Sequence, residues 1–393
     1  MSEQISRAVQ ISRDLIRCPS VTPAEGGALA YLESLLAGAG FRVERVTFSD
    51  TETPDVENLF ASYGSGAPHF VFAGHTDVVP PGNEQDWSHA PFSGDIEDGV
   101  LFGRGAVDMK GGVACFAAAA LDYIREQGEA FEGTISFLIT GDEEGPAVNG
   151  TVKLLEWCET QGHKFDTCIV GEPTNPAELG DAIKVGRRGS LSGIVTVKGT
   201  QGHAAYPHLA NNPIPGLMRL MSALDGVVFD AGNERFQPTN LEIVTFDVGN
   251  TAFNVIPARA QARFNVRFND EWTLDSLKER ISSELSAAAG DGLAWELEFR
   301  RDASESFLTK DERLIQTLSD AVLARTGRVP DLSTGGGTSD ARFIKNYCPV
   351  VEFGLVGQTM HKVDECAALS DIDGLTAIYR QFLEDYFKAA RGV

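Results

Sequence analysis

His-Phe-Val-Phe-Ala-Gly-His-Thr-Asp, residues 69–77, is an apolar run that ends in two polar side chains. An apolar run of this length is typical of a buried strand, and alternation along the strand puts His75 and Asp77 on one face. Open α/β sheets bind ligands at the carboxyl edge of their strands. We therefore expect His75 and Asp77 to lie at the ligand-binding edge of such a sheet.

Other short apolar runs predict further strands of this sheet, and amphipathic segments between them predict helices. Strands are expected at 41–47, 58–63, 134–139, 167–170 and 349–353, and helices at 3–17, 26–39, 110–127, 150–161, 310–326 and 371–389. Alternation of strand and helix predicts an α/β fold with a mixed, largely parallel sheet flanked by helices.

The pattern changes near Lys184. Segments that alternate like half-buried strands follow, with two helical segments among them: strands at 190–199, 241–248 and 260–268, helices at 213–225 and 274–288. We interpret residues 185–302 as an inserted α+β domain. Residues 1–184 and 303–393 then form the two parts of one catalytic domain.

The composition limits the possible partners and compartments. The chain has 393 residues and a formal net charge of -23, which disfavours nucleic acid and anionic membranes as partners. No apolar run is long enough to span a bilayer, and the first residues lack the features of a signal peptide. The six cysteines are widely spread without a Cys-x-x-Cys pair, which favours a reducing cytoplasm over a disulfide framework.

Four more segments place acidic or imidazole side chains beyond an apolar run or in a glycine-rich loop. They supply Asp108, the triplet 142–144, Glu172 and His361. Two imidazoles and several carboxylates at one sheet edge predict a site for two hydrolytic metal ions. Zinc binds these donors, and paired ions about 3.5–4 Å apart share a carboxylate.

The inventory of ligands for such a pair is complete. His75 and His361 would be the end ligands, and Asp108 would be the bridge. Glu144 and Glu172 would complete the set, and Asp77 could hold the other ring nitrogen of His75. Adjacent side chains on extended backbone point opposite ways, so Glu143 and Glu144 should have different roles. One binds metal and the other acts as general base toward a water whose pKa the metals lower.

The same segments allow other interpretations. Each segment alone is more often structural: a His-x-Asp at a strand end, or an acidic triplet in a solvated turn. A dehydrogenase would need a glycine fingerprint, which is absent from the glycine-rich loops 103–112 and 335–337. A non-enzymatic binding protein would have no reason to keep Glu143 beside a complete ligand set. The coincidence of five such segments favours the metal site.

With these residues in place, the chain resembles the dinuclear zinc aminoacylase/carboxypeptidase family of metallopeptidases. The resemblance rests on motifs that span nearly the whole chain in the family's order: 74–80, 103–112, 141–145, 171–174, 186–190, 201–213, 254–257, 336–343 and 360–361. It implies two Zn²⁺ per subunit, or Co²⁺ in the second site, and a homodimer formed through the inserted domain, which also acts as a lid.

The resemblance also implies roles for individual residues. One zinc would be held by His75, Asp108 and Glu172, and the other by Asp108, Glu144 and His361, with a cis peptide between Asp108 and Met109. Glu143 would be the general base and then the acid, and His203 would stabilise the oxyanion in the other subunit's site. The implied substrate-binding residues are Arg187, Tyr206, Asn254, Arg267, Gly337 and Thr338.

Three of the motifs, 186–190, 201–213 and 336–343, indicate the substrate. They imply hydrolysis of the anionic small molecule N-succinyl-LL-2,6-diaminopimelate in the synthesis of lysine and cell-wall precursors. The alternatives within the family are an acetylornithine deacetylase or an aminoacyl carboxypeptidase. The distinguishing feature is the number of cations for three substrate carboxylates, and four lie near the predicted domain junction: Lys184, Arg187, Arg188 and Arg267.

Overall fold

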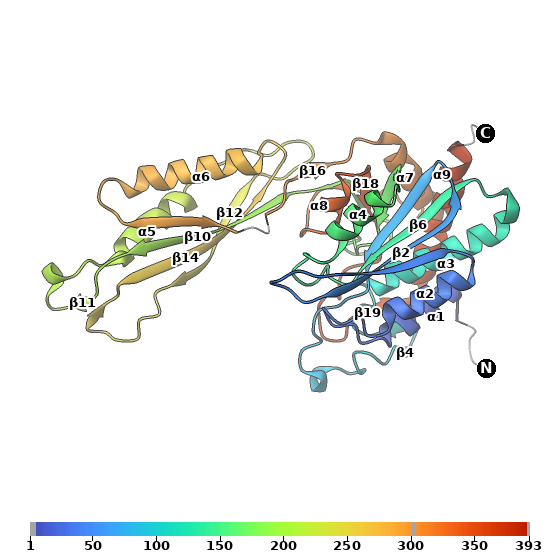
Figure 1. The fold of residues 1–393 in the computed structure, drawn as a ribbon, viewed down its shortest axis with the longest axis horizontal. Helices are drawn as coiled ribbons and strands as arrows, with labels where there is room; N and C mark the ends of the chain where they lie inside the picture. The colour runs from blue at the N-terminus through green and yellow to red at the C-terminus, as the bar shows by residue number, and fades with distance from the viewer. Residues whose placement is uncertain (1–4, 301–302, 391–393) are drawn as a thin grey trace. The chain divides into compact units, whose positions relative to one another are not determined.

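A computed structural model of the protein describes residues 5–300 and 303–390. The chain divides into two compact units (Figure 1). The first unit comprises the described residues of Met1–Val185, Thr309–Ser333 and Ser339–Val393, and the second those of Gly186–Leu308 and Thr334–Thr338. The second predicted domain boundary, between residues 302 and 303, adjoins residues 301 and 302, which lie outside the described residues. Residues 303–308, predicted to belong to the catalytic domain, group with the second unit. The loop 334–338, predicted to belong to the catalytic domain, groups with the second unit instead.

The first unit is built on a sheet in the order β1-β2-β6-β3-β7-β18-β8-β17. Its strands are β1 Arg42–Phe48, β2 Val56–Ser65, β3 His69–His75, β6 Gly133–Thr140, β7 Thr167–Val170, β8 Ala182–Lys184, β17 Asp331–Ser333 and β18 Val350–Glu352. The central strands β6, β3, β7 and β18 run parallel, whereas β1, β2 and β6 pair antiparallel. The predicted fold class, a mixed and largely parallel sheet flanked by helices, is confirmed.

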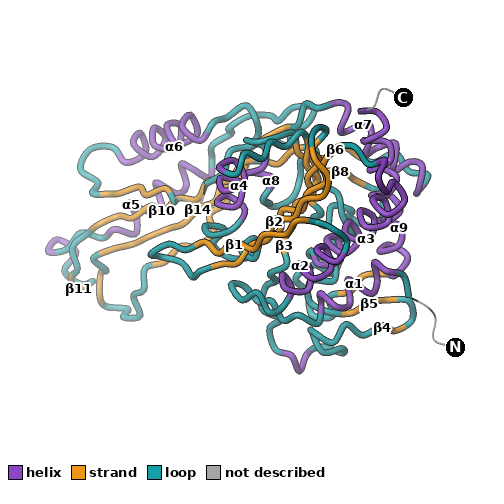
Figure 2. The backbone as a smooth tube through the Cα atoms, turned by 45° about the vertical axis from the view of Figure 1, so that its right-hand side comes forward, coloured by secondary structure: helices purple, strands orange, loops and turns teal. Residues whose placement is uncertain are grey.

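Helices cover both faces of this sheet (Figure 2). They are α1 Arg7–Ile16, α2 Ala28–Gly38, α3 Lys110–Gln127, α4 Thr151–Thr160, α7 Glu312–Thr326, α8 Ala341–Ile344 and α9 Leu369–Ala390, with short 3₁₀ turns at Glu84–Asp86 and Gly128–Ala130. The ring of Phe72 on β3 stacks on Phe116 of α3, with centroids 4.4 Å apart. On β2, Phe60 meets Trp157 of α4 edge-on. Every residue of β3 is buried, which explains why its sequence between His69 and His75 has no polar side chain.

A small sheet beside the main one was not predicted. Its order is β19-β5-β4, with strands β4 Ile96–Glu97, β5 Val100–Phe102 and β19 Cys366–Ala368. Strands of two or three residues are too short to show a periodic pattern. This sheet joins the start of the loop that carries Asp108 to the segment that follows His361.

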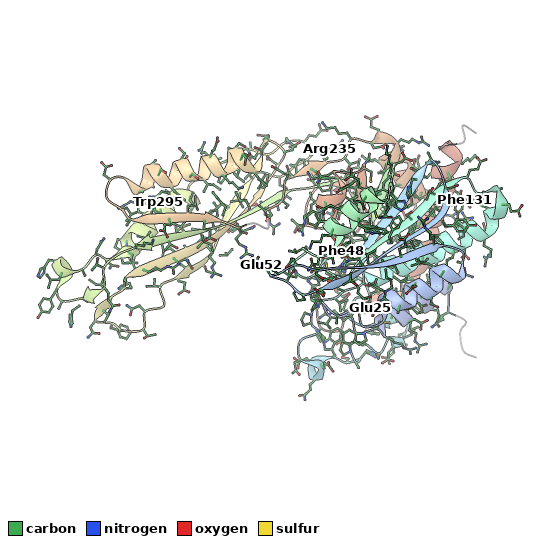
Figure 3. All side chains as sticks on the ribbon, in the orientation of Figure 1. Glu25, Phe48, Glu52, Phe131, Arg235 and Trp295 are labelled. Atoms are coloured by element: carbon green, nitrogen blue, oxygen red, sulfur yellow. The ribbon has the colours of Figure 1, made fainter. Side chains whose placement is uncertain are left out.

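The second unit is an antiparallel sheet in the order β12-β14-β10-β15, with two helices. Its elements are β9 Gly186–Arg187, β10 Gly189–Lys198, β11 Gly202–His203, a 3₁₀ turn Pro207–Leu209, α5 Pro213–Asp225, β12 Asn240–Asp247, β13 Val255–Ile256, β14 Arg259–Phe268, α6 Leu274–Ala289, β15 Trp295–Phe299 and β16 Phe307–Leu308. Alternate residues of β14 are buried against α5 and α6 in one apolar cluster, and Trp295 packs at its margin (Figure 3).

Side chains that cap helices explain several of the helix starts. The side chain at the N-cap accepts a hydrogen bond from a backbone N–H of the first turn at Ser6, Asn212, Thr273 and Asp311. Within the described residues, no helix is both long and apolar enough to cross a membrane.

Candidate metal centre and active site

Neighbouring parallel strands deliver most of the predicted ligands to one edge of the first unit's sheet. His75 is the last residue of β3, Glu144 follows β6, and Glu172 follows β7. Because β6, β3 and β7 pair in parallel, their carboxyl ends meet at the same edge. Asp108 comes from the loop between β5 and α3, and His361 from the segment that leads from β18 to β19.

Asp108 lies between the two predicted histidine ligands. Its Oδ1 is 3.2 Å from Nε2 of His75, and its Oδ2 is 3.3 Å from Nε2 of His361. One carboxylate that faces a different imidazole with each oxygen has the arrangement needed for a ligand shared between two cations.

The remaining carboxylates lie close to the same two imidazoles. Glu144 Oε1 lies 2.8 Å from Nε2 of His361, and Glu172 Oε1 lies 3.7 Å from Nε2 of His75. Possible ligand atoms fall within 4.8 Å of one another in two sets, His75 with Asp108 and Glu144, and His75 with Glu143 and Glu172. The structure therefore brings together every residue predicted to bind metal.

The local charges fit a site for cations. Hydrogen bonds to Asp108 and Glu144 raise the pKa of His361 to about 10. Burial lowers the pKa of His75, but its hydrogen bond with Asp108 and the neighbouring carboxylates outweigh burial, so the pKa is raised. The carboxylates thus favour the positively charged form of both rings, at the place where bound metal ions would supply that charge.

The hydrogen bond of His75 differs from the predicted one. Its Nδ1–H donates to the backbone carbonyl of Asp77 at 2.9 Å, whereas the Asp77 carboxylate is 3.7 Å from Nδ1. The expectation that this carboxylate directly holds the ring is therefore wrong. The bond to the carbonyl still keeps a proton on Nδ1 and leaves Nε2 as the ligand nitrogen of the neutral ring.

The Asp77 carboxylate instead holds the segment that carries the two adjacent glutamates. It accepts hydrogen bonds from the backbone N–H of Glu143 at 3.3 Å and of Glu144 at 3.1 Å. Residues 143–146 form a turn, so the expected extended backbone at this point is also wrong. The two side chains nevertheless diverge, because Glu144 faces His361 while Glu143 Oε2 lies 4.0 Å from Nε2 of His75.

Two backbone features accompany the ligands. The peptide between Asp108 and Met109 is cis, as the resemblance implied. His361 has a φ of +60°, in the left-handed region that residues other than glycine seldom adopt. No sequence signal marked this conformation.

The sequence interpretation missed a buried carboxylate near Glu143. Asp340, at 5% exposure, precedes α8 and stands within the motif 336–343, but no role was assigned to it. Burial and the charge of Glu172 raise the pKa of Glu143 well above its ordinary value, and Asp340 adds to this effect. A glutamate with a raised pKa suits a proton carrier near neutral pH.

The predicted substrate-binding residues lie in the second unit. Ala204 N–H donates to the carbonyl of Asn254, and the rings of His203 and Tyr206 lie 5.5 Å apart, so this part of the unit brings the three predicted residues together. Arg187 donates from Nη1 to the carbonyl of Gly337 at 2.8 Å, next to Thr338. Arg267 lies on β14, directly opposite Ser190 and Asn240.

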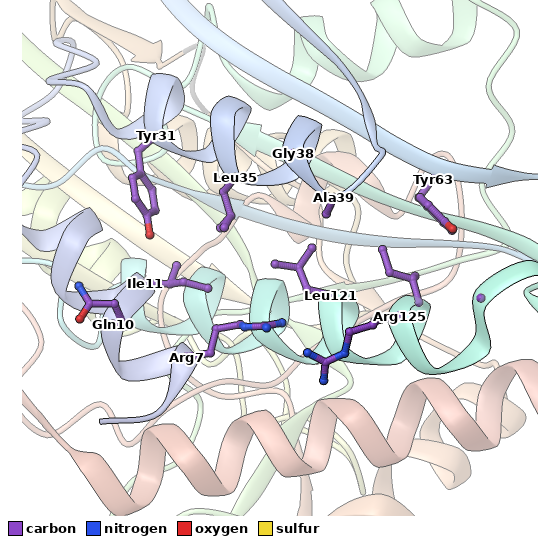
Figure 4. Close-up of a pocket in the computed structure, with 12 residues that line it drawn as sticks. Arg7, Gln10, Ile11, Tyr31, Leu35, Gly38, Ala39, Tyr63, Leu121 and Arg125 are labelled. Carbon is purple, nitrogen blue, oxygen red and sulfur yellow. The ribbon is translucent and has the colours of Figure 1, made fainter. Parts of the chain in front are cut away.

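A groove of about 710 Å³ lies elsewhere in the first unit, between α1, α2 and α3 (Figure 4). Its apolar lining includes Ile11, Leu35 and Leu121, and arginines 7 and 125 lie at its rim. Among the described residues, none of those predicted for the active site lines this groove.

The fold and the paired histidine–carboxylate groups define the protein as a metal-dependent hydrolase. A model of peptidase family M20/M25/M40 matches residues 71–385, and the chain belongs to this family. Members of the family are hydrolases of amide bonds that depend on metal ions.

Individual relatives agree with this assignment. A Methylorubrum populi protein named succinyl-diaminopimelate desuccinylase is 58% identical over 389 residues, covering 99% of this chain and 100% of the relative. Among solved structures, an M20 family metallo-carboxypeptidase from Sulfolobus solfataricus has a TM-score of 0.80 at 18% identity, covering 98% of this chain and 100% of that one. A Bacillus subtilis protein described as a dinuclear metal binding peptidase has a TM-score of 0.71 at 18% identity, covering 98% of each chain. These two structures share the fold.

Proposed function

We propose that the protein hydrolyses N-succinyl-LL-2,6-diaminopimelate to succinate and LL-2,6-diaminopimelate, a step in lysine and cell-wall precursor synthesis. The observation that carries the proposal is the 58% identity, over nearly the whole chain, to a protein named for this reaction. The geometry of the site supports it, because Asp108 lies between two histidines as a bridging ligand requires. On the cysteine pattern, we expect the enzyme to act in the cytoplasm.

We further propose that each subunit uses two Zn²⁺, or Zn²⁺ with Co²⁺ in the second site. One ion would be held by His75, Asp108 and Glu172, and the other by Asp108, Glu144 and His361. Imidazole nitrogen and carboxylate oxygen are donors that suit both metals. When bound, the ions supply Lewis-acid chemistry that polarises the amide carbonyl and makes the attacking water more acidic.

Glu143 is the proposed proton carrier. It takes a proton from the attacking water and delivers it to the amine that leaves, so that succinate and the free diamino acid are released. Its backbone N–H is held by the carboxylate of Asp77, which places the side chain beside His75. The raised pKa of Glu143 makes it a stronger base than an exposed glutamate.

The substrate's three carboxylates account for the proposed binding residues of the second unit. Arg187 and Arg267 would form charge-assisted hydrogen bonds with them. Tyr206, Asn254, Gly337 and Thr338 would contact the remaining polar groups of the substrate. These local cations would offset the negative charge of the whole chain, which otherwise repels an anionic substrate.

We propose that the enzyme is a homodimer formed through the second unit, and that His203 stabilises the oxyanion in the partner's site. The support is that His203 and the proposed ligands belong to different units of the chain. Mixing inactive Glu143→Gln and inactive His203→Ala subunits should restore up to half of the wild-type activity. One site of a mixed dimer would then carry both defects and the other neither. Absence of recovery despite demonstrated subunit exchange would contradict this proposal.

A substrate panel tests the proposed function. The zinc-loaded protein is assayed with N-succinyl-LL-2,6-diaminopimelate, N-acetylornithine and short peptides, and release of the free amine is measured. We expect kcat/KM to be highest for the succinylated substrate. A higher value for N-acetylornithine or for a peptide would replace the proposed substrate while leaving the reaction class intact.

A further inference from the structure

A buried ion pair joins the two segments that carry Asp108 and His361. Arg104 Nη1 lies 2.8 Å from Glu365 Oε2, and the two side chains are 3% and 0% exposed. Neither residue belongs to the ligands, the proton carrier or the substrate-binding set described above. A charge pair removed from water costs free energy, so its contacts should serve more than burial alone.

Glu365 holds the backbone from which the bridging carboxylate projects. Its Oε1 accepts hydrogen bonds from the backbone N–H of Val107 at 3.0 Å and of Asp108 at 3.2 Å. Its own carbonyl accepts from Gly103 N–H at 2.8 Å, and β19 pairs with β5 immediately beyond it. One side chain therefore fixes the peptide of Asp108 from the opposite segment.

Arg104 holds the backbone beside the second histidine. The same Nη1 that meets Glu365 also donates to the carbonyl of Lys362 at 3.1 Å. The guanidinium lies over the ring of Trp87, 5.0 Å from its centroid, which limits its movement. The His361 side chain is 47% exposed, so few packed neighbours fix its ring and the backbone beside it contributes to its position.

We propose that Arg104 and Glu365 form a positioning pair that sets the separation of Asp108 and His361, and hence the affinity of the metal centre. The pair touches neither metal nor substrate and acts through the backbone of residues 107, 108 and 362. The inference rests on the proposed function only in taking Asp108 and His361 as metal ligands. It is independent of which amide is hydrolysed.

The test separates positioning from simple stabilisation. The double variant Arg104→Met/Glu365→Leu keeps the side chains similar in bulk and leaves no unpaired buried charge, so the fold should persist. Stepwise Zn²⁺ dissociation constants are measured on metal-free protein by competition with a chelating dye, and Tm is measured on the same samples. We expect a folded apo protein whose Tm is lowered by the loss of the two backbone hydrogen bonds to Glu365, and binding of at least one Zn²⁺ weakened about 10–100-fold.

Two single variants complete the design. Arg104→Lys keeps the charge but is shorter and lacks the planar guanidinium that lies over Trp87, so it should weaken Zn²⁺ binding less than the double variant. Asp364→Asn is the control, because Asp364 bonds with Ser88 rather than with the peptides next to the ligands. Its Zn²⁺ affinity should equal that of the wild type.

Each outcome decides between the alternatives. Wild-type Zn²⁺ affinity at both steps in the folded double variant would overturn the inference. If the double variant does not fold, wild-type Zn²⁺ affinity in Arg104→Lys would overturn the inference instead. Wild-type protein that binds fewer than two Zn²⁺ would overturn the proposed dinuclear site, and the inference with it. A failed substrate assay alone would leave the inference intact, because the readout is Zn²⁺ binding.

Discussion

Replacement of Asp77 by Asn should lower turnover through Glu143 rather than through His75. The carboxylate of Asp77, itself buried, accepts two backbone N–H groups, at 3.3 and 3.1 Å. An asparagine side chain has one oxygen and one NH₂ group, so it can satisfy only one of them. The loss of one charge-assisted hydrogen bond is worth about 1.5–3 kcal/mol.

If that free energy is needed to place Glu143 in the transition state, kcat should fall about 10–150-fold. The contact that fixes the ring of His75 goes to the backbone carbonyl of residue 77 and survives the substitution. Steady-state kinetics at saturating Zn²⁺ and Zn²⁺ affinity should be measured together. We expect a reduced kcat with a much smaller change in affinity.

Asp50→Asn is a matched control. The Asp50 carboxylate also accepts two backbone N–H groups, from Glu52 and Thr53, in an exposed loop. The same substitution there should leave kcat unchanged. The opposite result would refute the reasoning about Asp77: wild-type kcat at saturating Zn²⁺ in Asp77→Asn, with Zn²⁺ affinity lowered about 10–100-fold. A loss of that size is expected when a residue acts through a ligand histidine.

Glu143→Gln should retain its Zn²⁺ and lose about 10²–10⁴-fold in turnover, since the ligands stay and the proton carrier is removed; loss of Zn²⁺ would instead make Glu143 a ligand. Arg187→Ala and Arg267→Ala should each raise KM for the succinylated substrate. The loss in binding free energy is about 2–5 kcal/mol if the lost ion pair is buried. The control Arg263→Ala, on the same strand β14, should leave KM unchanged. An unchanged KM in both Arg187→Ala and Arg267→Ala would favour a less anionic substrate. Burial lowers the pKa of His69 to about 4. As the pH falls, this histidine is therefore protonated in the unfolded chain before it is protonated in the folded protein. Stability should therefore fall by up to about 3 kcal/mol as the pH drops from 6.5 to 4, and urea unfolding of His69→Gln should show a shallower loss.

The central strands and the grouping of the ligands could be predicted because both depend on local patterns. An apolar run such as 69–74 identifies a buried strand, and parallel strands necessarily bring their carboxyl ends together. The hydrogen-bond partners could not be predicted in the same way. At a spacing of two residues, His75 can meet either the carboxylate or the carbonyl of Asp77, and only the path of the backbone decides which.

Elements that depend on tertiary pairing were also missed. Strands β5 and β19 carry no periodic signal, and they form because each supplies the partner of the other. The loop 334–338 joins the second unit through contacts such as Arg187 with Gly337, which the local sequence does not reveal. The burial of Asp340 and Glu365 could not be predicted either, because the sequence does not show whether an acidic residue is buried.

The proposed metal ligands come from distant parts of the chain, and this governs when the site can form during synthesis. Glu144 and His361 are 217 residues apart in sequence, yet their side chains meet. The second unit's sheet, by contrast, comes from one nearly continuous stretch, so it can fold on the ribosome before the first unit is finished. The proposed ligand set is complete only after His361 has been synthesised. A chain terminated before His361 would therefore lack the proposed ligand set and the stabilisation that bound metal would give.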